Sequence, residues 1–484
     1  MSELLNLEPK GLWKHFDKIC SIPHPSKHEE KIVAALVEFA KENNIEYKLD
    51  EVGNVIMRKP ATKGMENRKG VILQAHCDMV PQKNNDTKHD FLTDPILPRI
   101  EGEWVKATGT TLGADNGIGV AAALTVLEDK TLEHGPIEAL ITIDEETGMT
   151  GAFGLKAGEL EGDILLNLDS ETEGELYVGC AGGIDATITF DYTTEAFDSS
   201  YKAFALSIKG LKGGHSGMDI ILQRGNANKI LFRILKALEK VEVRVCEING
   251  GSSRNAIPRE AFCTIALPAA KVEEAKQILA NLTQIIKNEL SAVEPEILIA
   301  LEETANPESF IDSSAMARVI RAIYACPNGI YRMSDSMENL VETSSNLAIV
   351  KSDGKQIKAC ALLRSSVDSA KEDFAEMMAS VIELAGGEIE FTGGYPGWKP
   401  NMQSPILSTM QTTYNKLYGK TPKVMAIHAG LECGLLGGVY KNWDMISFGP
   451  TIQNPHSPDE RVNISSVSLF WNYLVETLKN VPQK

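Results

Sequence analysis

The chain of 484 residues is too long for one ordinary hydrophobic core, so two or more domains are expected. Its formal net charge of −18 argues against the basic surface that nucleic acids and anionic membranes require, and neither is expected as a partner. Scattered single cysteines, an amphipathic amino terminus and the lack of an apolar run of roughly 20 residues predict a reduced, cytoplasmic protein without a signal peptide or membrane span.

The first part of the chain alternates helical and strand patterns. Apolar residues at helical spacing predict helices over 31–41 and 117–128. Short apolar runs predict strands over 71–75, 139–143 and 164–168. This alternation predicts an α/β fold with a mostly parallel sheet. Such sheets carry their chemistry at the carboxyl ends of the strands.

From about residue 185 the pattern changes to α+β. Strands are predicted over 202–209 and 261–267, and helices over 227–238 and 272–290. A similar order of helix, strands and helix recurs between residues 315 and 385. The segments SSRNAI (252–257) and SSNLAI (344–349) also share letters. We therefore predict two related α+β modules, with coincidence over so short a stretch as the alternative.

The α/β pattern returns after a cluster of Gly and Pro over 393–400. The chain then ends in a predicted helix whose apolar face holds Val467, Phe470, Trp471, Leu474 and Leu478. The simplest organisation is one catalytic domain, formed by residues 1–185 and 400–484, that is interrupted by an insertion of residues 186–399.

Acids and histidines follow the predicted strands of the α/β part. They are His76 and Asp78 in VILQAHCD, Asp115 in GADNGIG, Glu145 and Glu146 in ITIDEETG, Asp169 in ILLNLDSE, and His456 in NPHSPD before the last helix. Each alone is typical of a cap or a surface residue. Together at one edge of a sheet they would repel one another unless a cation lay among them.

The donor types indicate which cation would bind. Imidazoles with carboxylates and no thiolate suit zinc, with manganese or cobalt as substitutes. Cys77 lies between His76 and Asp78, but the alternation of a strand directs it to the opposite face. The same alternation places His76 and Asp78 on one side, where Asp78 can accept the other imidazole N–H.

The motifs HCD, GADNGIG, DEETG, NLDSE and NPHSPDE, in this order, resemble the M20 family of binuclear metallopeptidases. The segments KHDFLTDPI (88–96), GGHSG (213–217), SSRNAIP (252–258) and HAGLE (428–432) are similar to its aminoacyl-histidine dipeptidase branch. The resemblance spans nearly the whole chain. It implies a metallopeptidase domain with an inserted α+β lid, two divalent metal ions, a small peptide substrate and a homodimer.

The resemblance also implies roles for individual residues. Asp115 would bridge the two metals, His76 and Asp169 would complete one site, and Glu146 and His456 would complete the other. Asp78 would be the orienting acid and Glu145 the general base. In the insertion His215 would stabilise the oxyanion, while Asn255, Arg364 and Gly430 would bind the substrate. Arg364 ends a strand pattern, and a surface position is the alternative for it.

The expected reaction is hydrolysis of dipeptides with a free carboxyl end, including Xaa-His dipeptides such as β-alanyl-histidine. Within the family, a tripeptidase or an N-acyl amino acid amidohydrolase would share the metal cluster and differ in the substrate pocket. A catalytically silent binding protein with the same fold is the alternative from another class. The complete set of ligand residues argues against a silent protein, because such a protein would be free to lose them.

Overall fold

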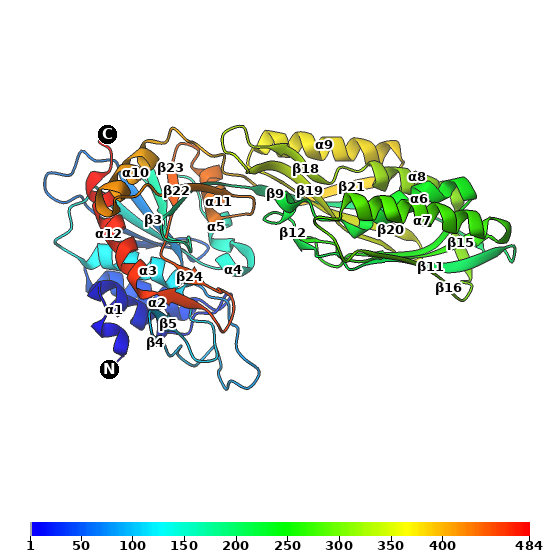
Figure 1. The fold of residues 1–484 in the computed structure, drawn as a ribbon. Coiled ribbons are helices and arrows are strands. Elements are labelled where there is room, and N and C mark those ends of the chain that lie inside the picture. Colours follow the sequence, from blue (N-terminus) through cyan, green and yellow to red (C-terminus); the bar gives the residue numbers. More distant parts are fainter. Residues whose placement is uncertain (1) are drawn as a thin grey trace. The chain divides into compact units, whose positions relative to one another are not determined.

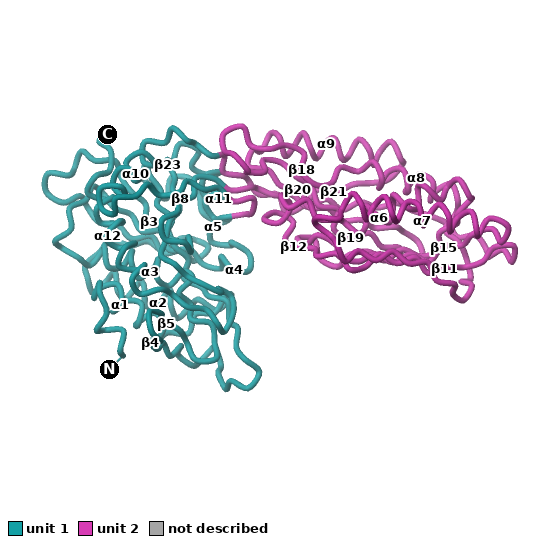
Figure 2. The backbone as a smooth tube through the Cα atoms, in the orientation of Figure 1, with its two compact units in different colours: residues 1–179, 400–426, 431–484 teal, residues 180–399, 427–430 magenta. Residues whose placement is uncertain are grey.

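The structure, a computed structural model, describes residues 2–484 and divides into two compact units (Figure 2). Unit 1 extends to Gly179 and resumes over Pro400–Ala426 and Leu431–Lys484. Unit 2 comprises Cys180–Lys399 and Ile427–Gly430. The short segment Ile427–Gly430 therefore belongs to unit 2, although its place in the sequence groups it with residues 400–484.

Unit 1 is built on an eight-stranded sheet with the order β1-β2-β6-β3-β7-β23-β8-β22 (Figure 1). Its central strands run parallel and are β6 (Ile137–Thr142), β3 (Val71–His76), β7 (Ile164–Asn167) and β23 (Asp444–Ser447). The outer strands are β1 (Glu46–Leu49), β2 (Val55–Lys59), β8 (Glu175–Cys180) and β22 (Lys423–Ile427). Strands β3, β6 and β7 are buried along their whole length, as expected where both faces of a sheet are covered.

The predicted α/β class is confirmed, with the parallel pairing confined to the centre of this sheet. The pairs β1-β2, β2-β6 and β8-β23 are antiparallel. The longer helices of unit 1 are α1 (Lys10–Cys20), α2 (Glu30–Glu42), α3 (Ala114–Glu128), α10 (Pro405–Tyr418), α11 (Glu432–Val439) and α12 (Ile464–Asn480). Helix α3 packs on β3 and α1. Across residues 2–484, no helix is both long and apolar enough to span a bilayer.

A smaller sheet in unit 1 joins two segments that are distant in the sequence. Its order is β24-β25-β5-β4, with β24 (Ile452–Gln453), β25 (Arg461–Asn463), β5 (Trp104–Lys106) and β4 (Arg99–Glu101). In the β25-β5 pair Arg461 lies opposite Lys106 and Asn463 lies opposite Trp104. The chain that leads into α3 is thereby held beside the chain that leads into α12.

Unit 2 is built on a nine-stranded antiparallel sheet, with four helices packed on one face around its main core (Figure 1). The strand order is β16-β11-β15-β13-β19-β20-β9-β21, and β18 pairs with β19. The strands are β9 (Gly182–Asp191), β11 (Tyr201–Lys209), β13 (Arg244–Gly250), β15 (Ala261–Pro268), β16 (Leu298–Glu303), β18 (Gly329–Met333), β19 (Val341–Ser352), β20 (Gln356–Ser365) and β21 (Glu388–Tyr395). The helices are α6 (Ala227–Leu238), α7 (Val272–Glu289), α8 (Ser313–Ala325) and α9 (Asp368–Leu384).

Both halves of the insertion contribute to this one sheet: β13 pairs with β19, and β9 lies between β20 and β21. The two segments with shared letters have different local structures. SSRNAI forms a turn followed by the short strand β14 (Ala256–Ile257), whereas SSNLAI lies inside the long strand β19. Their likeness is therefore not a likeness of structure.

Candidate metal centre

The seven candidate metal-centre residues come from segments at the carboxyl ends of the parallel strands and from two further loops. Three segments follow central strands: His76 ends β3 and is followed by Asp78, Glu145 and Glu146 begin the short helix α4 (Glu145–Gly148) after β6, and Asp169 follows β7. The other two residues come from elsewhere. Asp115 lies in the first turn of α3, and His456 precedes β25. Parallel strands end at the same edge of a sheet, so residues far apart in the sequence lie close together here.

The side chains form two overlapping groups. Ligand atoms of His76, Asp115 and Asp169 lie within 4.8 Å of one another, and so do those of Asp115, Glu146 and His456. The Nε2 atom of His76 lies 3.2 Å from Asp115 Oδ1 and 3.3 Å from Asp169 Oδ1. The Nε2 atom of His456 lies 3.2 Å from Asp115 Oδ2 and 3.0 Å from Glu146 Oε2. The two oxygens of Asp115 thus face different groups, an arrangement that suits a carboxylate shared by two cations.

The carboxylate oxygens of this cluster are incompletely satisfied by the protein. Glu146 Oε1 is buried and has no donor, and the buried Asp169 Oδ1 faces the His76 ring at 3.3 Å without a hydrogen bond of regular geometry. A buried carboxylate oxygen without a donor is unfavourable unless a cation compensates it. The donors are imidazole nitrogens and carboxylate oxygens, which suit zinc, manganese or cobalt. The residues therefore fit divalent metal ions.

The pKa values show the same excess of negative charge. Burial raises the pKa of Asp169 to about 7, and the carboxylates of Asp115 and Glu146 act in the same direction, against His76. Burial alone would lower the pKa of His76, but nearby carboxylates, above all Asp169, raise it well above its usual value. Hydrogen bonds to Asp115 and Glu146 raise the pKa of His456 to about 11. Protons on the imidazoles here balance charge that a metal ion would balance instead.

Asp78 connects His76 to the start of α4. The Nδ1 atom of His76 lies 3.1 Å from the backbone oxygen of Asp78 and 3.3 Å from its Oδ1. The carboxylate accepts the N–H groups of Glu145 and Glu146, at 3.0 and 3.3 Å, and the hydroxyl of Ser26, at 2.8 Å. Burial opposes ionisation, but the hydrogen bonds and the charge of His76 hold the pKa of Asp78 at about 2. Asp78 is therefore an ionised anchor, and Ser26 is a partner that the sequence did not reveal.

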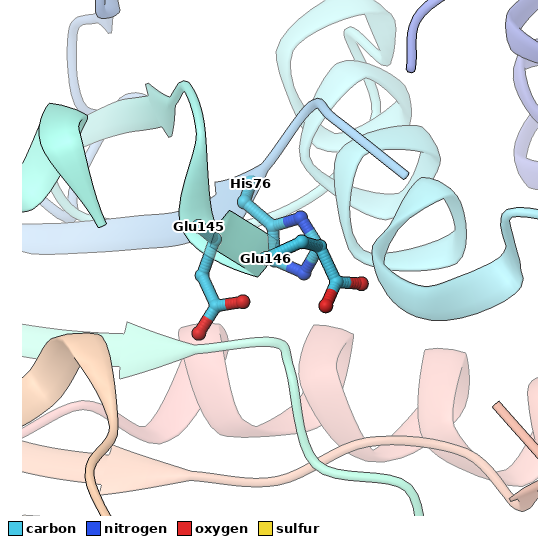
Figure 3. Close-up of side chains that lie close together, drawn as sticks. All are labelled: His76, Glu145 and Glu146. Atoms are coloured by element: carbon cyan, nitrogen blue, oxygen red, sulfur yellow. The ribbon is translucent and has the colours of Figure 1, made fainter. Parts of the chain in front are cut away.

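Glu145 lies beside the ligand groups. It forms a further group with His76 and Glu146, whose ligand atoms also lie within 4.8 Å of one another, and Figure 3 shows these three side chains together. Burial raises the pKa of Glu145 well above its usual value; the charge of His76 opposes this, and the carboxylates of Asp169 and Glu432 add to it. A carboxyl group with a raised pKa is suited to accept a proton near neutral pH.

Comparison with known proteins identifies the family. Residues 72–480 match the model of peptidase family M20/M25/M40. The chain belongs to this family. The cytosol non-specific dipeptidase of Escherichia coli (strain K12) is 51% identical over 485 residues, which cover 100% of both chains. The resemblance seen in the motifs is confirmed, and this M20 peptidase is a hydrolase of peptide bonds, as predicted.

Solved structures extend the likeness to the whole fold. The crystal structure of aminoacylhistidine dipeptidase from Vibrio alginolyticus is 53% identical, with a TM-score of 0.97, and the match covers 100% of this chain and 99% of that chain. Aminopeptidase PepT from Bacillus cereus shares the fold at 16% identity, with a TM-score of 0.57 and coverage of 98% of this chain and 99% of that chain.

The predicted substrate-binding residues of this M20 peptidase lie in unit 2. His215 lies in β12 (Gly214–His215), which pairs with β14 immediately after the exposed Asn255. The Nδ1 atom of His215 accepts the N–H groups of Gly217 and Met218, at 3.2 and 3.0 Å. Burial and the charge of Arg364 lower the pKa of His215. The ring is therefore neutral with its proton on Nε2, which can donate a hydrogen bond.

Arg364, in β20, is buried with only 5% of its surface exposed, so the alternative of a surface position is wrong. Its guanidinium group donates to the hydroxyls of Tyr395, at 3.0 Å, and Ser216, at 3.4 Å. These partners leave its charge unneutralised, so the group is suited to an incoming carboxylate. A Cβ at Gly430 would lie 3.1 Å from the Tyr395 ring, so a larger residue would crowd this side chain.

His428 is a further unit 2 residue near Arg364 that the sequence did not single out. It is buried, and its Nε2 lies 2.7 Å from the hydroxyl of Ser344. Burial, followed by the charge of Arg364, lowers the pKa of His428 to about 3. The imidazole is therefore neutral. The motif HAGLE, which contains His428, contributes to the family resemblance. No other pattern in the sequence indicates a role for this histidine.

We expect Asp115→Ala to weaken metal binding at both sites together, because the two oxygens of Asp115 face both ligand groups. Metal content and dissociation constants measured on the purified protein would check this. Asp129→Ala, at the opposite end of α3, is the matched control. One emptied site beside an intact one would contradict a shared role for Asp115.

Proposed function

We propose that the chain is a binuclear metal-dependent dipeptidase that hydrolyses dipeptides with a free carboxyl end, including Xaa-His dipeptides such as β-alanyl-histidine. The observation that carries the proposal is the pair of ligand groups that share Asp115, with Glu145 beside them. Two relatives named as dipeptidases match the chain over its whole length, at 51% and 53% identity, and support this substrate class.

The same proposal includes the metal, the location and the assembly. Zinc is the proposed metal, with manganese or cobalt as substitutes, because the ligands are imidazoles and carboxylates. A cytoplasmic location is supported by the name of the Escherichia coli relative and by the eight cysteines, which are scattered singly along the sequence. A homodimer is proposed from the resemblance to the family.

The proposed mechanism assigns proton transfer to Glu145. The two bound cations would supply Lewis-acid chemistry, by polarising the scissile carbonyl and acidifying the attacking water. Glu145 accepts the proton of that water and later delivers it to the leaving amine. Asp78 keeps the His76 ring and the Glu145–Glu146 turn in place through its carboxylate.

The proposed roles of unit 2 follow from the hydrogen bonds of its residues. His215 would stabilise the oxyanion with its Nε2–H, because its Nδ1 is already occupied as an acceptor. Arg364 would bind the free carboxylate of the substrate, with Asn255 and Gly430 lining the same subsite. Recognition of a free carboxyl group on the residue that follows the scissile bond would favour dipeptides over longer peptides.

A substrate panel tests this proposal directly. The zinc-loaded enzyme would be assayed for kcat/KM with dipeptides, including β-alanyl-histidine, with tripeptides of matched composition and with N-acyl amino acids. We expect dipeptides to be preferred, and removal of the free carboxyl group by amidation to lower kcat/KM. Preference for tripeptides or N-acyl amino acids would overturn the dipeptidase assignment, and no turnover with full metal would favour a silent binding protein.

We expect Glu145→Gln to retain both metal ions and to lose at least about 10²-fold in kcat, because the amide cannot accept the proton of the attacking water. Steady-state kinetics combined with metal analysis would measure this. Turnover close to that of the wild type with full metal would rule out Glu145 as the general base.

We expect His215→Ala to lower kcat by about 10²- to 10³-fold with a much smaller change in KM, because an oxyanion donor acts mainly in the transition state. Metal content should be unchanged. A rise in KM at constant kcat would instead indicate that His215 only binds the substrate.

A mixture of His215→Ala and Glu145→Gln chains would show which chain His215 serves. Activity that recovers in mixed oligomers would mean that the histidine acts in a neighbouring copy. No recovery, with subunit exchange demonstrated, would mean that it acts in its own chain.

A further inference from the structure

Glu460 is a buried carboxylate to which the proposed mechanism gives no role. Its exposed fraction is 2%, and it directly precedes β25. Oε2 accepts the N–H groups of Leu112, at 2.7 Å, and Gly113, at 3.0 Å. Oε1 accepts the N–H groups of Ala114, at 2.8 Å, and Asp115, at 3.2 Å. Both oxygens are thus filled by four successive backbone donors of the segment that carries Asp115.

The segment that leads into α3 has no acceptor of its own for these donors. Helix α3 begins at Ala114, and Gly113, which precedes it, provides no side-chain cap. Gly113 has a φ of +72°, and a Cβ at this position would lie 3.0 Å from the sulfur of Met79. A larger capping residue is therefore disfavoured at position 113. Buried backbone N–H groups require acceptors, and Glu460 supplies them from 345 residues away.

The position of Asp115 depends directly on these bonds. Its own N–H group donates to Glu460, so the bond is separated from its carboxylate only by the Cα and Cβ atoms. Asp115 is also the residue that both ligand groups share. A shift of the backbone here would move both of its oxygens at once.

The segment that carries Glu460 also carries His456. The Ser457 hydroxyl donates to the backbone oxygen of Asn454, at 3.1 Å. The N–H group of Glu460 donates to the backbone oxygen of Ser457, at 3.0 Å. These bonds close a compact turn around His456, which lies 3.2 Å from Asp115. Glu460 therefore connects the segments of two ligand residues, and the β25-β5 pair holds the same segments side by side.

We propose that Glu460 is a positioning residue that fixes Asp115 relative to His456 and thereby sets the metal affinity of both sites. This inference rests on the proposed function, because it takes the two ligand groups to be metal sites. The hydrogen-bond geometry and the burial of Glu460 carry it.

Glu460→Gln tests this role because it preserves the size of the side chain and removes acceptor capacity. An amide has one acceptor oxygen, and its NH₂ group would face two N–H donors. We expect the zinc dissociation constants of both sites to rise together by about 10- to 100-fold, the usual effect of losing a group that orients metal ligands. Glu460→Asp keeps the charge and both acceptors on a shorter side chain, and we expect intermediate affinity.

Zinc affinity would be measured by competition with a chromophoric chelator on the metal-free chain, with the absorption spectrum of the cobalt-substituted protein as a second readout. Glu138→Gln is the matched control. Glu138 is buried in β6 and accepts the N–H groups of Glu161 and Gly162, both at 2.8 Å, but contacts no proposed ligand. We expect this control to lower Tm while its zinc constants stay within about twofold of the wild type, since a purely structural loss does not alter the ligands.

Wild-type zinc constants in Glu460→Gln, with a lower Tm like that of Glu138→Gln, would overturn the proposal. Should Glu460→Gln fail to fold, the same criterion applies to Glu460→Asp. Weakening of one site alone would also overturn it, because the shared Asp115 requires both sites to change. A wild-type chain that binds no zinc would overturn the proposed metal centre as well, so failure of the two proposals is distinguishable.

Discussion

The structure of unit 1 depends on how negative charge is balanced at one edge of its sheet. Asp115, Asp169 and the adjacent Glu145 and Glu146 project from three segments into one small volume, and Glu146 Oε1 has no hydrogen-bond donor. Without compensation these groups would repel one another and force the loops apart. Divalent cations supply that compensation most directly, and the strongly raised pKa of His456 reflects the same demand.

The balance in unit 2 is the opposite. Arg364 is a buried cation whose described partners are hydroxyl groups, and its charge adds to burial in lowering the pKa values of His215 and His428. The two imidazoles are therefore neutral hydrogen-bonding groups and do not add positive charge. A guanidinium group without a carboxylate partner favours a ligand with one carboxylate. The electrostatics of unit 2 thus support the substrate class that the full-length relatives suggest.

The sequence predicted that the acids and histidines of the candidate metal centre lie at one edge of the sheet, because the signals for this are local. His76 and Asp169 follow apolar runs whose ends must meet at one edge of a parallel sheet, and this needs no knowledge of side-chain contacts. The burial of Arg364 was not predictable, because the strand pattern does not show that Tyr395 and Ser216 cover it. The hydrogen-bond partners of Glu460 were equally unpredictable, since the four N–H donors lie about 345 residues earlier in the chain. The missed features are hydrogen bonds between residues far apart in the chain, because such bonds leave no local pattern in the sequence.

The carboxylates around the centre fall into two kinds according to what fills their oxygens. Asp78 and Glu460 accept backbone N–H groups on both oxygens, so they are occupied as anchors of the loops. Glu146 and Asp169 each keep one oxygen without a hydrogen bond of regular geometry, so they remain able to bind a cation. If a backbone N–H group bound the oxygen of a metal ligand, that ligand would bind the metal more weakly. If the backbone of a ligand residue were not held, the ligand would move away from its neighbours. Carboxylates whose oxygens are filled by backbone N–H groups therefore hold the loops, and carboxylates with an unfilled oxygen remain available to a cation.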